Sequence, residues 1–323
     1  MARSDLLINL VKAGSRGDHS LFQRTVDAII AEERGKQHNV LALQLEKAFT
    51  KNGESTPHVP QSVNGFHSAL FHEQIPGRSI DDLILASPTS AACLELIEEQ
   101  HRADILRSHS LEPRNRVLLI GPPGNGKTCL AEAIAKGLGV SLLSVRYESL
   151  VGSYLGETAT RLQKLFDYAV NRPCVLFFDE FDTLGKERGD VHDTGEIKRV
   201  VSSLLLQIDR LPSYVVVVAA TNHQELLDRA VWRRFQLRLE LPRPTPTQTA
   251  KWMQMAKAKW KFPSGVSAKS IAEQLKFESF AELEEFVLDV IRRMVLAHDN
   301  KEAAMILKSR ISQWKARSRA RTK

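Results

Sequence analysis

RVLLIGPPGNGKTCLAEAIAKGL, residues 116–138, is the stretch that decides the fold. An aliphatic run comes first, a glycine-rich loop follows, and a helix-forming segment ends the stretch. From Gly121 to Thr128 the loop has the spacing G-x-x-x-x-G-K-[ST], a motif that carries weight only between a strand and a helix. Glycines let backbone N–H groups face one point, and the helix adds the positive end of its dipole there. The stretch therefore predicts a loop that binds nucleotide phosphates.

Two side chains of this loop carry the expected chemistry. Lys127 places a cation beside the β- and γ-phosphates, and the hydroxyl of Thr128 is a ligand for Mg²⁺. We therefore expect ATP and Mg²⁺ as the bound species. The expected nucleotide contacts are Gly121, Pro122, Pro123, Gly124, Asn125, Gly126, Lys127, Thr128 and Asp179.

A second motif, CVLFFDEFD at residues 174–182, places acids directly after an apolar run. The run predicts a buried strand, and carboxylates at the carboxyl end of such a strand need a reason. Asp179 is expected to hold Mg²⁺ together with Thr128, and Glu180 to polarise the attacking water as a general base. For Asp182 we expect no more than a capping role.

Around these motifs, short apolar runs alternate with helical segments. This alternation is typical of a parallel sheet covered by helices on both faces. The expected class is α/β, with a phosphate-loop parallel-sheet ATPase domain, a C-terminal helical lid and a small N-terminal helical domain. The strand candidates are Val117–Ile120, Val140–Val145, Cys174–Phe178, Val215–Ala220 and Gln236–Leu241, and one helix is expected from Ser90 to Ser108.

Changes in composition mark the expected domain boundaries. Apolar residues at helical spacing predict a helical N-terminal domain at 1–49, and the stretch 50–65, with its prolines and glycines, is typical of a linker. The ATPase domain then covers 66–243 and the helical lid covers 244–307. Residues 308–323 form a basic tail that contains seven Lys and Arg and no acid.

Charge, cysteines and hydropathy limit the classes of function. The net charge of +7 equals the seven basic charges of 308–323, so the rest of the chain is close to neutral. We interpret that tail as solvated and frayed, with a contact to nucleic acid or an acidic partner as the alternative. Three cysteines without a C-x-x-C pair fit a reducing cytoplasm. No apolar run reaches the ~20 residues of a membrane span, so no membrane association is expected.

Two further motifs, VVVVAATN ending at Asn222 and LLDRAVWRRF at 226–235, complete a resemblance to the AAA family of ring ATPases, in its protein-remodelling branch. The resemblance covers about residues 75–300. It implies that Asn222, at the tip of the sensor-1 strand, helps to position the attacking water. It also implies that Arg233 and Arg234 are arginine fingers that reach the ATP of a neighbouring subunit. The active form would then be a homo-oligomeric ring, which in this family is usually a hexamer.

The resemblance also implies pore loops. The segment YESLVGSYLGETATRLQKLF at 147–166 matches the segment in which the family carries an aromatic residue, an aliphatic residue and glycine, here Tyr154, Leu155 and Gly156. In a ring, such side chains would grip an extended polypeptide in the axial channel. By the same resemblance, the segment GKERGDVHDTGE at 185–196 would be the second pore loop, although its charges are equally typical of a solvated loop.

One segment of the lid departs from the family. Near 277–283 the family often has the sequence Gly-x-Ser-Gly-Ala-Asp-Leu, and this chain has Phe280 in place of a glycine. Contacts from this segment to adenine or ribose are therefore not predicted. No sensor-2 arginine is identified either.

These features lead to one expected function and two alternatives. The expected function is ATP hydrolysis that drives remodelling or unfolding of a protein client through the pore of a ring. The chain also resembles stand-alone bacterial AAA proteins, some of which pair with a subtilisin-like protease against phage or incompatible plasmids. The alternatives are a nucleic-acid-associated motor or loader, and a nucleotide switch that activates a partner protease.

Overall fold

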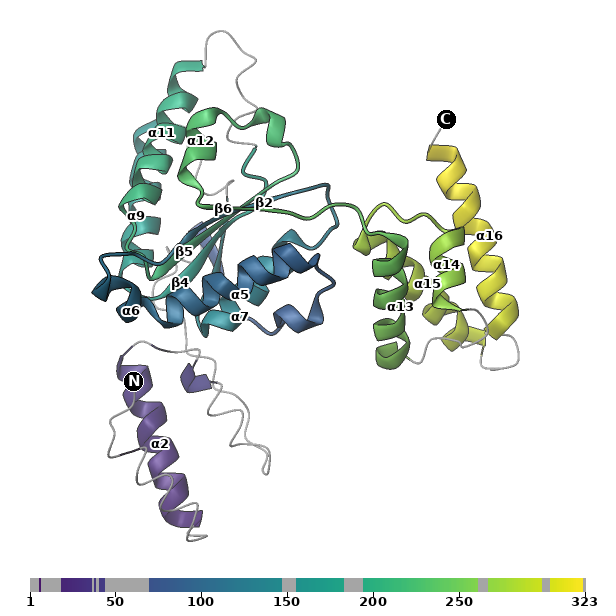
Figure 1. Cartoon of the computed structure of the whole chain (residues 1–323), viewed down its shortest axis with the longest axis horizontal. Helices are drawn as coiled ribbons and strands as arrows, with labels where there is room; N and C mark the ends of the chain where they lie inside the picture. The colour runs from purple at the N-terminus through teal and green to yellow at the C-terminus, as the bar shows by residue number, and fades with distance from the viewer. Residues whose placement is uncertain are drawn as a thin grey trace.

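A six-stranded sheet forms the centre of the larger lobe (Figure 1). The computed structural model describes residues 6, 19–36, 38, 41–43, 70–146, 155–182, 194–260, 267–297 and 303–321. The strand order is β1-β3-β4-β5-β2-β6, with β1 antiparallel to β3 and the other pairs parallel. The strands are β1 (Phe71–Gln74), β2 (Arg116–Ile120), β3 (Ser141–Val145), β4 (Cys174–Phe178), β5 (Val215–Thr221) and β6 (Leu237–Glu240).

Helices cover both faces of this sheet, because successive residues of a strand point to opposite faces. On one face lie α5 (Ser87–His101) and α7 (Lys127–Leu138), and on the other lie α9 (Leu155–Val170) and α11 (Thr194–Arg210). Alternate residues of β2 belong to the two hydrophobic cores, each buried against its own pair of helices. The arrangement confirms the predicted α/β class and the parallel sheet.

Two local elements differ from the sequence-based expectation. The edge strand β1 was not predicted, since only four residues pair and a run of that length shows no clear alternation. The helix expected from Ser90 to Ser108 is in fact two helices, α5 and α6 (Ala103–Ser108), separated at Arg102. Short helical segments complete the lobe: η1 (Ile80–Asp82), η3 (Gln224–Leu226) and α12 (Arg229–Arg234).

The second lobe is helical and is joined to the sheet lobe by extended chain after β6 (Figure 1). Its helices are α13 (Pro246–Trp260), α14 (Ala268–Gln274), α15 (Phe280–Ala297) and α16 (Ala303–Arg321). They share one core, to which Ile271, Phe286 and Leu307 contribute. We refer to this lobe as the lid.

The basic segment that begins at residue 308 is not a frayed tail. It belongs to α16, where Ile311 is buried in the lid core and Trp314 packs against it. The Trp314 ring lies 5.6 Å from that of Phe286 and 6.1 Å from that of Phe277, measured between centroids. The sequence interpretation failed here because the basic residues outnumber the apolar ones, although the apolar residues recur at the spacing of one helix face.

Of the predicted N-terminal domain, the structure describes mainly the helix α2 (His19–Gly35). The predicted linker 50–65 lies outside the described residues, so the division into domains stays a prediction. Within the described ranges, no helix is both long enough and apolar enough to cross a membrane.

Candidate active site

The glycine-rich loop between β2 and α7 has the backbone that the sequence motif requires. Gly124 (φ 77°) and Gly126 (φ 84°) both lie in the left-handed region, and Gly126 is the N-cap of α7. A Cβ at Gly124 would also lie 2.9 Å from the Ser279 Oγ atom of the lid. Glycine therefore lets the loop turn and lets the lid approach it.

Lys127, the first residue of α7, is buried and fully hydrogen-bonded. Its ammonium group donates to the carbonyl oxygens of Gly121 (2.7 Å) and Pro122 (3.0 Å) and to Oδ1 of Asn222 (2.6 Å). Burial lowers the pKa of Lys127, while the negative charges of Asp179 and Asp182 oppose that shift. The structure thus joins two predicted site residues, Lys127 and Asn222, that lie 95 positions apart.

The end of β4 brings the predicted acids to the same place. The Thr128 hydroxyl donates to Oδ2 of Asp179 across 3.1 Å, and the other oxygen of Asp179 accepts from the backbone N–H of Glu180 at 2.9 Å. Hard oxygen ligands of this kind suit Mg²⁺, so the pair Thr128–Asp179 fits the metal that the sequence implies. Glu180 has φ 47°, which is uncommon outside glycine and is often retained at functional sites.

Asp182 is buried between β4 and β5, with 2% of its surface exposed. Its Oδ1 accepts a hydrogen bond from the Thr221 hydroxyl at 2.9 Å and from the Asn222 backbone N–H at 3.3 Å. Sequence reasoning gave Asp182 a capping role only. Its described partners lie at the end of β5 and directly after it, and sequence order alone does not indicate them. The residues that follow Asp182 lie outside the described ranges, so the capping role stays a prediction.

The two predicted arginine fingers differ in their surroundings. The Arg234 side chain donates to Oδ2 of Asp209 at 2.8 Å and to the carbonyl of Ala230 at 2.9 Å. Asp209 also pairs with Arg116 at 2.7 Å. In contrast, Arg233 is exposed, and its guanidinium makes no hydrogen bond or ion pair within the described ranges. Only Arg234 is therefore held inside its own subunit.

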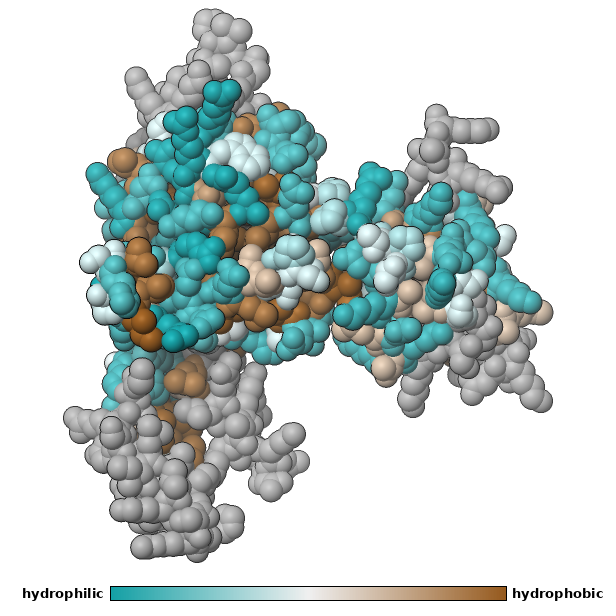
Figure 2. Space-filling view, in the orientation of Figure 1, coloured by the Kyte–Doolittle hydropathy of each residue, from teal (hydrophilic) through white to brown (hydrophobic). Residues whose placement is uncertain are grey.

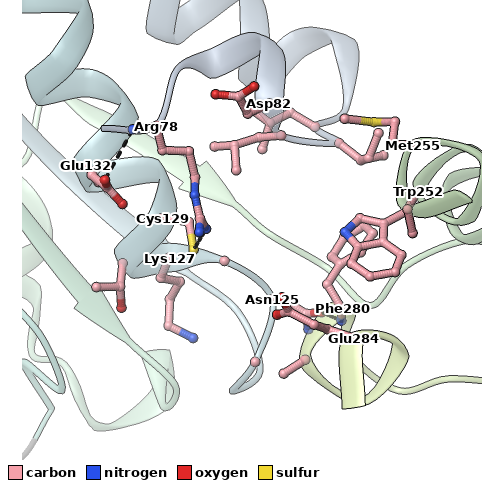
Figure 3. A pocket seen from close by; sticks show the side chains of 18 of the residues that line it. Arg78, Asp82, Asn125, Lys127, Cys129, Glu132, Trp252, Met255, Phe280 and Glu284 are labelled. Atoms are coloured by element: carbon pink, nitrogen blue, oxygen red, sulfur yellow. Dashed lines mark hydrogen bonds between the residues drawn. The ribbon is translucent and has the colours of Figure 1, made fainter. Parts of the chain in front are cut away.

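A cavity of about 1170 Å³ opens beside the loop and extends to the lid (Figure 3). Besides the loop itself, its walls come from residues 77–85 of the sheet lobe and from α13 and α15 of the lid. Figure 2 shows hydrophobic residues gathered where the sheet lobe faces the lid. The lining residues that no sequence motif indicated include Arg78, Asp82, Trp252, Met255, Phe280 and Glu284.

The lid contacts the glycine-rich loop directly. The N–H of Ala281 donates to the Gly124 carbonyl at 3.0 Å, and the N–H of Phe280 donates to Oδ1 of Asn125 at 3.3 Å. These amides open α15, where first-turn N–H groups have no partner inside the helix. The lid segment in which the sequence departs from the family therefore reaches the loop, and Phe280 lines the cavity.

Two side chains of α7 hold the segment of Gly77 and Arg78, which lines another wall of the cavity. Oε1 of Glu132 accepts from the backbone N–H groups of Gly77 (2.9 Å) and Arg78 (3.2 Å), and Lys136 donates to the Gly77 carbonyl at 2.6 Å. From this wall the Arg78 side chain extends to the thiol of Cys129 (Figure 3).

The predicted pore residues are not placed by the structure. Tyr154 and most of 185–196 lie outside the described residues. Leu155 is the first residue of α9, and nothing is described of its side chain. The pore assignment stays a prediction.

Comparison with known proteins agrees with this site. Residues 117–243 match the ATPase family associated with various cellular activities (AAA). The chain is 36% identical over 303 residues to the AAA family ATPase y4kL of Sinorhizobium fredii, an alignment that covers 92% of this chain and 90% of the relative.

Peroxisomal ATPases are also similar. Identity with PEX6 of Komagataella phaffii is 30% over 293 residues, which are 84% of this chain and 25% of the relative. Identity with pex6 of Schizosaccharomyces pombe is 42% over 134 residues, which are 40% of this chain and 14% of the relative. The chain spans a quarter or less of these two longer proteins.

Proposed function

This chain belongs to the AAA family of ATP-hydrolysing enzymes, and we propose that it uses ATP hydrolysis to remodel or unfold a protein client in a ring of identical subunits. The observation that carries the proposal is the convergence of Lys127, the Thr128–Asp179 pair and Asn222 at one end of the sheet. These groups come from two motifs and from the end of a third strand, and they meet beside the glycine-rich loop, whose amides would face a bound phosphate group.

In the proposed mechanism, binding uses the loop and its lysine. The amides from Gly124 to Thr128 surround the β- and γ-phosphates, and Lys127 exchanges one of its present acceptors for a phosphate oxygen. Thr128 and Asp179 would hold Mg²⁺, which when bound neutralises charge that develops on the phosphate oxygens. The cavity beside Arg78 and Trp252 is large enough for the nucleoside.

Hydrolysis in this mechanism uses Glu180 and Asn222. Glu180 accepts a proton from the attacking water, and the Asn222 amide orients that water near the γ-phosphate. We assign the finger in trans to Arg233, because it is exposed and has no described partner, whereas Arg234 is bonded to Asp209 of its own chain. Arg234 then anchors α12, the helix that presents Arg233.

The lid would transmit the nucleotide state to the client. Its amides at Phe280 and Ala281 bond to the loop, so a change in loop position moves α15 with it. A protein client is supported by the resemblance of the segment with Tyr154 and Leu155 to a pore loop. The free thiols of Cys93, Cys129 and Cys174 agree with a reducing cytoplasm.

The nucleic-acid alternative receives less support from α16. Arg310 lies 3.5 Å from Asp289, Arg317 lies 3.4 Å from Glu285, and Lys315 donates to Gln274 at 2.9 Å. The lid's own polar groups therefore contact three of the seven basic residues of 308–323. For the alternative of a nucleotide switch, the presence of both Glu180 and Asn222 argues for turnover.

The experiment that tests the proposal is client trapping with the Glu180→Gln variant. Under Mg-ATP this variant should form rings and retain client proteins, which mass spectrometry would identify after crosslinking. The Lys127→Ala variant is the matched control, since its ATP affinity should be much lower. At an ATP concentration that saturates only Glu180→Gln, it should retain none of these proteins. Identical recovery with both variants, or recovery of DNA alone, would contradict a protein client.

A further inference from the structure

Asp182 is the buried acid of the site to which the proposed mechanism gives no role. We propose that Asp182 is a positioning residue for hydrolysis, which acts by fixing Asn222 at the end of β5. The inference rests on the proposed function, because it concerns how Asn222 is held for the same reaction.

The contacts of Asp182 cross from β4 to the sensor strand. One carboxylate oxygen accepts from the Thr221 hydroxyl at 2.9 Å and from the Asn222 N–H at 3.3 Å. Next to it, the Phe181 N–H donates to the Ala220 carbonyl at 2.8 Å, so pairing with β5 continues past the last residue of β4. Two adjacent residues after β4 therefore hold three consecutive residues, which are the last two of β5 and Asn222 directly after it.

Burial makes this contact rigid. Asp182 is 2% exposed and Thr221 is 0% exposed. A carboxylate at such a depth is costly unless its oxygens are hydrogen-bonded, so the Thr221 hydroxyl and the Asn222 amide have little freedom to move away. A surface cap would not impose this constraint.

From Asn222 the chain of contacts reaches the phosphate loop. The backbone of Asn222 bonds to Asp182, and its side-chain Oδ1 accepts from Lys127 Nζ at 2.6 Å. The negative charge of Asp182 also opposes the burial-induced fall in the pKa of Lys127. Asp182 thus fixes the backbone of Asn222, from which the Asn222 side chain extends to Lys127.

The first test is Asp182→Asn, which keeps the shape, removes the charge and weakens the hydrogen bonds from Thr221 and Asn222, because a neutral amide oxygen is a weaker acceptor than a carboxylate oxygen. We expect kcat to fall roughly 10- to 100-fold, the usual effect of losing a group that orients a functional residue, while affinity for a fluorescent ATP analogue changes less than about threefold. Asp104→Asn is the matched control, because Asp104 has a 96% exposed side chain on α6. An unchanged kcat in Asp182→Asn would overturn the inference.

The second test separates positioning from a general structural effect. If Asp182 acts through Asn222, then Asp182→Asn in an Asn222→Ala background should lower kcat by less than about twofold further. A double variant whose loss equals the product of the two single losses would overturn the inference. Should Asp182→Asn fail to fold, Thr221→Val replaces it in both tests, since it removes the hydroxyl donor with little change in volume.

The ATP turnover of the wild-type protein shows whether the proposed function or only this inference has failed. Wild type without Mg-dependent ATP turnover would overturn the proposed function and this inference with it. Wild type that turns over ATP, combined with multiplicative losses in the double variant, would overturn the inference alone.

Discussion

The ammonium nitrogen of Lys127 lies 2.6 Å from Oδ1 of Asn222, which joins the phosphate loop to the end of β5 across the site. The other two ammonium hydrogens are taken by the carbonyls of Gly121 and Pro122. A lysine has three donors and no acceptor. A phosphate oxygen must therefore replace one of these three acceptors, and Asn222, directly after β5, is the one that lies outside the phosphate loop.

Replacing Lys127 with alanine should lower ATP affinity. A hydrogen bond to a charged group contributes about 1.5–3 kcal/mol, so the dissociation constant should rise roughly 10- to 100-fold, and turnover should fall to background. Titration with a fluorescent ATP analogue measures the first effect, and phosphate release measures the second. Lys269→Ala, an exposed lysine of α14, is the control. Unchanged ATP affinity in Lys127→Ala would contradict the assignment of this loop as the ATP-binding site.

Glu180→Gln should separate binding from hydrolysis. The amide keeps the size of the side chain but cannot accept a proton, so ATP binding should persist while turnover falls about 10²–10⁴-fold. Single-turnover experiments with labelled ATP measure the chemical step directly. Glu98→Gln is a matched control, since the Glu98 side chain is 62% exposed on α5. Turnover near the wild-type rate would exclude Glu180 as the base.

Sequence predicted the parts of the site that short segments determine. The phosphate loop needs glycines at fixed spacing between a strand and a helix, so residues 121–128 identify it without other information. The acids at the end of β4 could be predicted in the same way, because carboxylates directly after a fully apolar strand are unusual. In both cases the predicted backbone geometry is local and the structure has it, while the roles of the side chains stay predictions.

The remaining parts of the site depend on contacts between distant segments. Asn125 and Phe280 are 155 positions apart, and nothing in either neighbourhood indicates that their atoms meet. The same holds for the Glu132 clamp on Gly77 and for the bond from Thr221 to Asp182. Such contacts depend on how the lobes and strands pack, and one sequence carries no periodic signal for that.

Asp179→Asn should raise the Mg²⁺ concentration that turnover requires. Asp179 accepts from Thr128 and presents carboxylate oxygens, and the amide would keep the hydrogen bond but lose the negative charge. We expect the Mg²⁺ concentration at half-maximal rate to rise roughly tenfold or more, which corresponds to about 1.4 kcal/mol. The measurement is ATPase rate against free Mg²⁺, with Asp104→Asn for comparison. An unchanged Mg²⁺ dependence would contradict the assignment.

Trp314→Ala should destabilise the lid although it lies in the basic segment. The half-buried ring packs against Phe277 and Phe286, and its loss should cost about 2 kcal/mol, less than for a fully buried tryptophan. Thermal unfolding would show this as a lower Tm. Ser312→Ala, an exposed neighbour, should leave the Tm unchanged. An unaffected Tm in Trp314→Ala would instead favour the solvated tail expected from composition.

Arg234 should be coupled to Asp209 of the same chain. If their ion pair anchors α12, then adding Arg234→Ala to Asp209→Ala, which also removes the pair with Arg116, should cause little further loss of turnover. An Arg234 that acted only on the neighbouring subunit would give losses that multiply. Because both side chains are partly exposed, the effect on Tm should be small.

Arg233→Ala should be inactive alone and recover when mixed with Lys127→Ala. The first variant has an intact phosphate loop and the second an intact finger, so a mixed ring contains some sites that combine both. In a random equal mixture about a quarter of the sites do so, and turnover should approach that fraction of the wild-type rate. Arg229→Ala, an exposed arginine of the same helix α12, should keep full activity without mixing. A mixture that stays inactive, in rings shown by native mass spectrometry to contain both variants, would mean that Arg233 does not act on the neighbouring site.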